Sequence, residues 1–262
     1  MTEDLMYELL NPEFNSTVNQ RLDGMVEAFY GSAPAVRQLA TSPTIDKQLF
    51  VRHTIETILR IRLARIADSK VILHFARTNP FAAQKWCTYT EQAMLRDRLF
   101  LRELRNLGVS DESVSGADTS LATKLLQGYL YYTIEHEGPC ALLSKSYFVE
   151  YILRKTQQLW NGHVTRMLDE PSLKGVEVHL LPEDDEDRSA FVWNVLMATV
   201  RSAEDETRVL YHLDACYGLF VACFNELASN GNVSPPPQDP AGAAVTGAHQ
   251  AAQLGTKPDD AP

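Results

Sequence analysis

The sequence predicts an all-α fold, a single bundle of about seven to eight helices, from three observations. Apolar residues recur every three or four positions along most of the 262-residue chain, which is the spacing of one helix face. Strand patterns are nearly absent, and the one short candidate, residues 176–181, lies between a glycine and a proline. Capping and stop residues separate the periodic segments, which is typical of helices joined by short links.

Each predicted helix has its own start or stop signal. Gly31 ends the first, a Ser-Pro pair opens the second, Pro80 starts the third, and Gly108 stops it. Inward faces are expected to contain Leu49, Ile55, Ile58, Leu59 and Ile66 in the second helix, and Leu121, Leu125, Tyr129 and Tyr132 in the fourth. The helices are expected over residues 15–30, 42–79, 80–107, 118–137, 140–168, 184–199 and 205–227.

Composition divides the chain into two parts. Residues 1–228 keep an apolar content that suits one helical domain, whereas residues 229–262 are rich in Pro, Ala and Gly with few large aliphatic residues. Such a segment buries too little apolar surface to offset its ordering entropy. We expect a disordered tail over residues 229–262.

Charge and composition exclude several classes of function. The net charge of −10 disfavours nucleic acid as a partner, and no run of 18 apolar residues predicts a membrane span. The acidic N-terminus does not resemble a signal peptide. Four scattered cysteines without CxxC spacing indicate buried free thiols in a reducing compartment, so we expect a soluble cytoplasmic protein.

Common catalytic motifs are missing from the sequence. It contains no glycine-rich phosphate loop, no HExxH, no GxSxG and no Glu-x-x-His. His53 and Glu56 are also three positions apart, but here the histidine comes first, beside an Arg-rich helix face. We interpret them as a surface pair.

Two carboxylates lie on predicted inward helix faces. Glu91 shares a face with Ala83 and Met94, and large apolar residues surround Glu150. A buried carboxylate is costly unless it meets a cation, a hydrogen-bond donor or a metal. The alternatives are a solvated position or pairing with Arg98 for Glu91, and a surface pair with Arg154 for Glu150.

A third candidate segment, residues 176–191, joins a histidine to a run of acids. His179 precedes Asp185 and its acidic neighbours, just before an apolar helical run. Acids at this place suit the N-terminus of a helix, whose dipole favours negative charge. Alternatively, an imidazole and carboxylates together suit iron.

With helix order and these blocks combined, the chain resembles the haem-oxygenase-like superfamily, which includes thiaminase-type proteins, the pyrroloquinoline quinone synthase family and di-iron oxidases. The resemblance covers about residues 45–227 and rests on residues 89–108, 137–150 and 179–191. It implies a haem-oxygenase-like helical bundle. Homodimerisation is a further expectation from this superfamily.

The di-iron branch implies an enzyme, a dioxygen-dependent non-haem iron oxidoreductase that acts on a small amino-acid-like or fatty-acid-like molecule in specialised metabolism. The resemblance assigns iron, as one ion or a di-iron centre, to Glu91, Glu150, His179 and Asp185. Glu91, Asp97 and Glu150 are the expected catalytic residues, with Asp97 able to complete the ligand set. Glu135 is a competing match for the position of Glu150.

Two departures from that pattern support an alternative. Asp97 or Arg98 stands where the first histidine is expected, and Arg188 stands at the closing histidine. Guanidinium groups stay protonated and do not ligate iron, so they could instead neutralise carboxylates, as Arg98 with Glu91 and Arg188 with Asp185. The alternative is a metal-free protein that binds a small molecule, works without a cofactor or supports a catalytic partner chain.

The thiaminase branch and a helical interaction protein are the remaining interpretations. Residues 96–100 resemble the Asp-containing block of thiaminase-type proteins, with Asp97 as the aspartate. Their nucleophilic cysteine has no counterpart, because Cys140 falls at a different place along the chain.

Overall fold

The computed structural model describes residues 12–32, 36, 46–167 and 188–229. Within these ranges it contains nine helices and no strand, so the prediction of an all-α fold is confirmed. None of the described helices is long and apolar enough to cross a membrane. The helices are α2 (Pro12–Ser32), α4 (Lys47–Thr78), α5 (Pro80–Ala93), α6 (Asp97–Asn106), α7 (Asp111–Ser115), α8 (Leu121–His136), α9 (Cys140–Met167), α11 (Arg188–Met197) and α12 (Ala203–Ser229). The strand candidate at 176–181 and residues 230–262 of the predicted tail lie outside the described residues.

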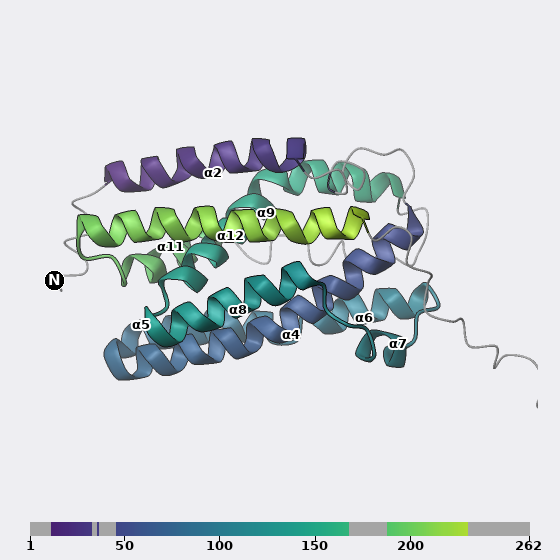
Figure 1. The fold of residues 1–262 in the computed structure, drawn as a ribbon, viewed down its shortest axis with the longest axis horizontal. Coiled ribbons are helices and arrows are strands. Elements are labelled where there is room, and N and C mark those ends of the chain that lie inside the picture. The colour runs from purple at the N-terminus through teal and green to yellow at the C-terminus, as the bar shows by residue number, and fades with distance from the viewer. Residues whose placement is uncertain (1–11, 33–35, 37–45, 168–187, 230–262) are drawn as a thin grey trace, which may run out of the picture.

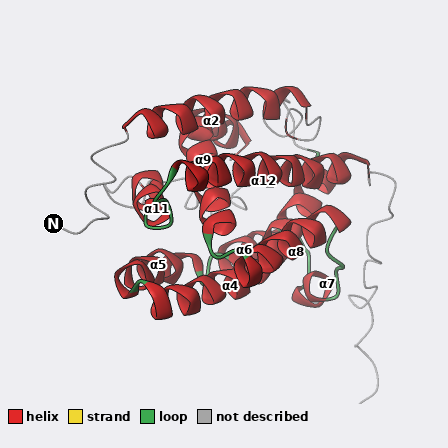
Figure 2. Ribbon diagram, turned by 60° about the vertical axis from the view of Figure 1, so that its left-hand side comes forward, coloured by secondary structure: helices red, strands yellow, loops and turns green. Residues whose placement is uncertain are grey.

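The helices form two groups with α9 between them. On one side α2 and α12 run side by side, and on the other α4 packs against α5, α6 and α8 (Figures 1 and 2). Helix α9 contacts α2, α11 and α12 as well as α4 and α8. Helix α12 also contacts α8 and α4, so α9 and α12 together join the two groups.

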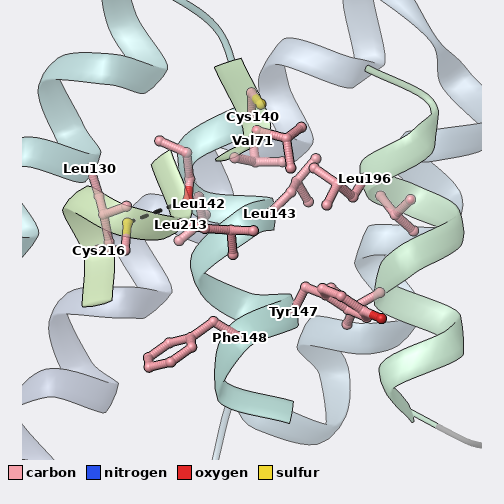
Figure 3. Close-up of a cluster of buried hydrophobic side chains, with 14 of the residues drawn as sticks. Val71, Leu130, Cys140, Leu142, Leu143, Tyr147, Phe148, Leu196, Leu213 and Cys216 are labelled. Carbon is pink, nitrogen blue, oxygen red and sulfur yellow. Dashed lines mark hydrogen bonds between the residues drawn. The ribbon is translucent and has the colours of Figure 1, made fainter. Parts of the chain in front are cut away.

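The main core is built around the first turns of α9. Leu142, Leu143 and Phe148 of this helix are fully buried. Figure 3 shows that four other helices supply side chains around them: Val71 from α4, Leu130 from α8, Leu196 from α11, and Leu213 and Cys216 from α12. A helix covered on several sides can keep a polar residue only where a donor, an acceptor or an internal space meets it.

Two glutamates from other helices hold the N-terminus of α8. Ser120 caps this helix by accepting a hydrogen bond from Thr123 N, and its own hydroxyl donates to Glu56 Oε1 over 2.7 Å. Glu226 of α12 accepts from the backbone N–H groups of the next two residues, over 3.1 and 2.9 Å. Both carboxylates satisfy N–H groups that a helix end leaves without partners. Glu56 is only 5% exposed, so its interpretation as half of a surface pair is wrong.

The helix predicted from residue 80 to residue 107 is broken in the structure. Residues 94–96 form turns with bonds from residue i to i−3, such as Arg96 N to Ala93 O at 3.2 Å, and the chain then continues as α6. Asp97, the first residue of α6, forms ion pairs with Arg62 and Arg65 of α4. These contacts hold α6 against α4, which a straight continuation of α5 would not allow.

Inward faces are also shifted from those predicted. Leu49 and Ile58 of α4 are buried as expected, but Ile66 is 51% exposed. In α8 the expected face is largely on the outside, with Leu121, Leu125 and Tyr132 all more than half exposed. The buried stripe lies one position later, at Ala122, Leu126, Leu130 and Ile134. Apolar residues on both faces of α8 made the two registers hard to separate by periodicity alone.

All four cysteines are free thiols, and three of the four are buried as predicted. Cys140, Cys216 and Cys223 are buried, whereas Cys87 on α5 is exposed. Burial raises the pKa of the Cys140 thiol to about 11, which leaves it protonated and weakly nucleophilic at neutral pH.

The observed buried face of α8 predicts a large loss of stability for one Leu→Ala substitution on this helix and almost none for another. Leu130→Ala should lower the free energy of unfolding by about 2–5 kcal/mol, because it opens a cavity in the core. Leu125→Ala, five residues earlier on the exposed side, should change it by less than about 0.5 kcal/mol. Urea unfolding followed by circular dichroism measures both. Equal losses for the two variants would contradict the observed register.

Candidate functional site

A cavity of about 320 Å³ lies inside the bundle, among α4, α5, α8, α9 and α12. Its volume is at the lower end of the range of roughly 300–1,000 Å³ that is usual for small-molecule sites. Aromatic side chains form much of its wall: Phe29, Phe50, Tyr89, Phe100, Phe220 and Phe224. An enclosed space with apolar walls and a few polar groups is the usual form of a ligand site.

One face of α4 lines the cavity over its middle turns. The lining positions recur every three or four residues, which places them on a single stripe: Phe50, His53, Thr54, Thr57, Arg60, Ile61, Ala64, Arg65 and Asp68. Several of these residues are polar or charged. The Arg-rich segment of this helix therefore points partly inward, and its interpretation as a surface face is corrected for Arg60 and Arg65.

Helix α9 supplies the facing wall. Its lining residues follow the same spacing: Lys145, Ser146, Val149, Glu150, Ile152 and Leu153. The opposite side of this helix belongs to the core described above. Lys145, Ser146 and Glu150 of α9 thus face the cavity, on the side of the helix away from this core.

Glu150 is buried and held by two groups. Its Oε1 accepts a hydrogen bond from the Tyr89 hydroxyl at 2.7 Å and lies 3.5 Å from Arg188 Nη2. The Arg188 guanidinium also lies over the Tyr89 ring, 5.1 Å from its centroid. Burial, followed by the nearby charge of Glu150, raises the pKa of Tyr89 well above its usual value, so this hydroxyl remains a donor.

Two arginines that line the cavity have no carboxylate partner within residues 12–32, 46–167 and 188–229. Arg60 donates to Thr57 Oγ1 at 3.0 Å and lies over the rings of Phe220 and Phe224, each centroid 5.6 Å from Cζ. Its Nη1 is buried without a hydrogen-bond partner. Arg96 enters the lining from the turn between α5 and α6. Arg65, by contrast, is paired with a carboxylate.

Lys145 and Asp68 also line the cavity, and burial shifts the pKa of each. Burial lowers the pKa of the Lys145 ammonium, with Arg60 adding to this and Asp68 opposing it. Burial raises the pKa of Asp68 to about 6, against the opposing effects of Lys145 and Trp86. Both side chains line the cavity and are half-buried. They are therefore reachable from the cavity although they are removed from bulk water.

His53 is neutral at physiological pH. Its ring packs 5.4 Å from the Phe224 ring, and burial together with the Arg60 charge lowers its pKa to about 3. It lines the cavity and does not form the surface pair predicted from its spacing to Glu56.

The structure separates the carboxylates that the sequence grouped together. Glu150 lines the cavity, but Glu91 is exposed and absent from the lining, so its prediction as an inward residue is wrong. Arg98 is exposed too, and no ion pair joins it to Glu91. Asp97 is 5% exposed and neutralised by Arg62 and Arg65 of α4. Glu135, the competing match, forms an exposed ion pair with Lys70.

The described donors do not fit an iron centre. No three histidine, cysteine or acidic residues of the described ranges converge on one point, and the Glu150 carboxylate faces a guanidinium and a phenol. Iron requires several deprotonated donors around it, whereas cations already neutralise the buried carboxylates Glu150 and Asp97. His179 and Asp185 lie outside the described residues, so their assignment as iron ligands stays a prediction.

Sequence reasoning missed the residues that make this site polar. Arg60, Asp68, Arg96 and Lys145 were not among the candidates, although α4 carries a usable signal. Polar residues at positions 53, 57, 60 and 68 share the helix face of the apolar residues at 50, 61 and 64. A face that mixes charges with large apolar groups indicates either a membrane surface or an internal cavity.

Comparison with known proteins gives the fold. No protein-family model and no curated protein matches the sequence. The crystal structure of a domain of unknown function with a heme oxygenase-like fold, from Shewanella denitrificans OS217, aligns with a TM-score of 0.72. The two chains are 16% identical, and the alignment covers 82% of this chain and 92% of that one.

The chain is therefore a haem-oxygenase-like helical bundle with a partly cationic cavity. The fold expected from the resemblance is confirmed. Because the neighbour is itself of unknown function, the likeness assigns neither substrate nor reaction.

The raised pKa of Asp68 predicts a pH-dependent cost in stability. A carboxyl with a folded pKa of about 6 and an unfolded pKa of 3.8 stabilises the folded state fully below pH 4, and this contribution is lost as the pH rises through 6. Asp68→Asn should therefore gain stability relative to the wild type between pH 5 and pH 8, by about 1 kcal/mol. Urea unfolding at several pH values measures this difference.

Asp118→Asn is the matched control, because Asp118 is exposed and its pKa is lowered, first by a hydrogen bond from Lys124. The difference in the free energy of unfolding between this variant and the wild type should not change over the same pH range. A flat difference for Asp68→Asn as well would contradict the burial of this carboxyl.

Proposed function

We propose that this chain is a metal-free, haem-oxygenase-like protein that binds a small organic acid with an apolar body in its internal cavity. The observation that carries the proposal is the presence of two cavity-lining guanidinium groups, Arg60 and Arg96, without carboxylate partners in the described residues. The proposal belongs to the metal-free alternative that the arginine at position 188 suggests.

The charge balance of the lining supports an anionic ligand. Four cationic residues line the cavity, namely Arg60, Arg65, Arg96 and Lys145, against the two acids Asp68 and Glu150. The acids do not offset the free cations, because Glu150 is held by Arg188 and burial favours the neutral form of Asp68. A buried cation is costly unless an anion meets it, and a ligand carboxylate would supply that anion.

The remaining walls support an apolar body of limited size. Phe220 and Phe224 flank Arg60, and further aromatic and aliphatic residues close the space around it. A planar or branched apolar group beside the guanidinium would bury its surface there, which contributes about 25 cal/mol per Å². The ligand is thus expected to carry its acid group close to an aromatic or aliphatic body.

Binding of matched acids and amides tests the proposal. We expect 3-phenylpropanoate or 4-phenylbutanoate to bind the full chain in isothermal titration calorimetry, with the corresponding amides much weaker. Arg60→Met should weaken acid binding about 10- to 100-fold, because a hydrogen bond to a charged group contributes about 1.5–3 kcal/mol. Methionine retains an apolar stem of similar shape, so the cavity wall should persist.

Arg77→Met is the control for this substitution. Arg77 lies in the last turn of the same helix, α4, and is exposed. Its variant should bind the acids as the wild type does. Equal affinity for acid and amide, or unchanged binding in Arg60→Met, would contradict recognition of an anion in the cavity.

Iron loading separates this proposal from the oxidase expectation. One observation favours the oxidase as a second candidate, namely that Glu150 lines the cavity as the resemblance implies. After anaerobic incubation with Fe(II) and desalting, we expect less than stoichiometric iron, because Arg188 and Tyr89 hold that carboxylate. One or two irons per chain that disappear in Glu150→Ala and in Glu91→Ala would support the oxidase instead.

A further inference from the structure

We propose that Lys145 forms a covalent imine with an aldehyde or ketone group of the cavity ligand, and that Asp68 serves as the proton donor for this step. The inference rests on the cavity of the proposed function and deepens it by naming a carbonyl compound as the substrate class. Lys145 is the nucleophile of this step.

The geometry places the two groups on facing walls of the same cavity. Asp68 comes from the stripe of α4 and Lys145 from the stripe of α9. No hydrogen bond or ion pair joins Lys145 to any residue of the described ranges, although the charges of Asp68, Arg60 and Glu150 act on its ammonium. By contrast, Lys70 pairs with Glu135 and Lys124 with Asp118, and both of these lysine side chains reach solvent. Lys145 is thus an amine that is directed to the cavity and not committed to a salt bridge.

The environment favours the protonation states that imine formation needs. An amine attacks a carbonyl only when neutral, and burial shifts the Lys145 pKa in that direction. The groups that act on this amine from α4, α9 and α12 are Asp68, Arg60, Glu150 and Cys216, and burial outweighs them. Asp68, with a pKa of about 6, can give and take a proton near neutral pH.

The step balances without an oxidant, a reductant or a metal. Lys145 Nζ forms a bond to the carbonyl carbon, and the π electrons of the carbonyl move to its oxygen, which becomes a hydroxyl after proton transfer from the nitrogen. The C–O bond then breaks, and the hydroxyl leaves as water with the proton of the Asp68 carboxyl. The products are a protonated imine on Lys145, a carboxylate on Asp68 that stabilises its positive charge, and one water molecule.

Reductive trapping of the wild-type protein tests the inference. The full chain is incubated at pH 7 with phenylpyruvate, a 2-oxo acid with an aromatic body, and sodium cyanoborohydride, and adducts are located by peptide mass mapping. Lys145 should carry at least about tenfold more adduct than Lys85, because the cavity holds the carbonyl compound beside the Lys145 amine. Lys85 is the internal comparison, because it is exposed and makes no ion pair with any described residue.

Two controls keep the test independent of variant folding. The same mapping is repeated in about 8 M urea, which unfolds most domains. It should show no preference for Lys145, because that preference depends on the folded cavity. Asp68→Asn should slow trapping at Lys145 while Lys85 reacts as before. Adducts spread evenly over exposed lysines in the folded protein, or none at Lys145, would overturn the inference. If phenylpyruvate binds but is not trapped, the inference fails and the proposed acid-binding function stands.

Discussion

The burial of α9 is the constraint on which the rest of the structure depends. Its first turns contact apolar side chains from four other helices, and this packing fixes the helix between the two groups of the bundle. The helix nevertheless carries Lys145 and Glu150, whose charges cannot be placed among leucines without a large desolvation cost. An internal space on the side of α9 away from this core resolves this conflict. The cavity and the core thus lie against different faces of the same helix, α9.

The same desolvation sets the chemistry of the cavity. Where a carboxylate meets a cation, as Glu150 meets Arg188 and Asp97 meets two arginines, the charge is neutralised by the protein. Where a buried charged group makes no ion pair, its pKa shifts toward the neutral form, as it does for Asp68 and Lys145. Arg60 has neither outlet among the described residues, because a guanidinium stays charged and its contacts there include a hydroxyl and two aromatic faces but no carboxylate. We propose that a ligand anion balances its charge.

The fold was predictable from the sequence to a greater extent than the site. Periodicity with Gly and Pro stops gave the all-α class and most helices, whereas the break at residues 94–96 depends on a contact between Asp97 and arginines 30 or more positions earlier. Glu150 was found because apolar neighbours surround it in sequence. Glu91 was misplaced because the turns after α5 begin just beyond it; Met94, which seemed to share its face, is exposed, although Ala83 is buried. Lys145 and Asp68 could not be paired, because their proximity exists only after α4 and α9 pack.

The most direct test of the account is the location of a bound acid in a crystal of the full chain. Crystals soaked with 3-(4-bromophenyl)propanoate would show the bromine by its anomalous scattering and the carboxylate in the density map. The account predicts bromine inside the cavity near Phe220 and Phe224, with the carboxylate within hydrogen-bond distance of Arg60. A cavity filled by its own side chains, or bromine bound only on the outer surface, would contradict it.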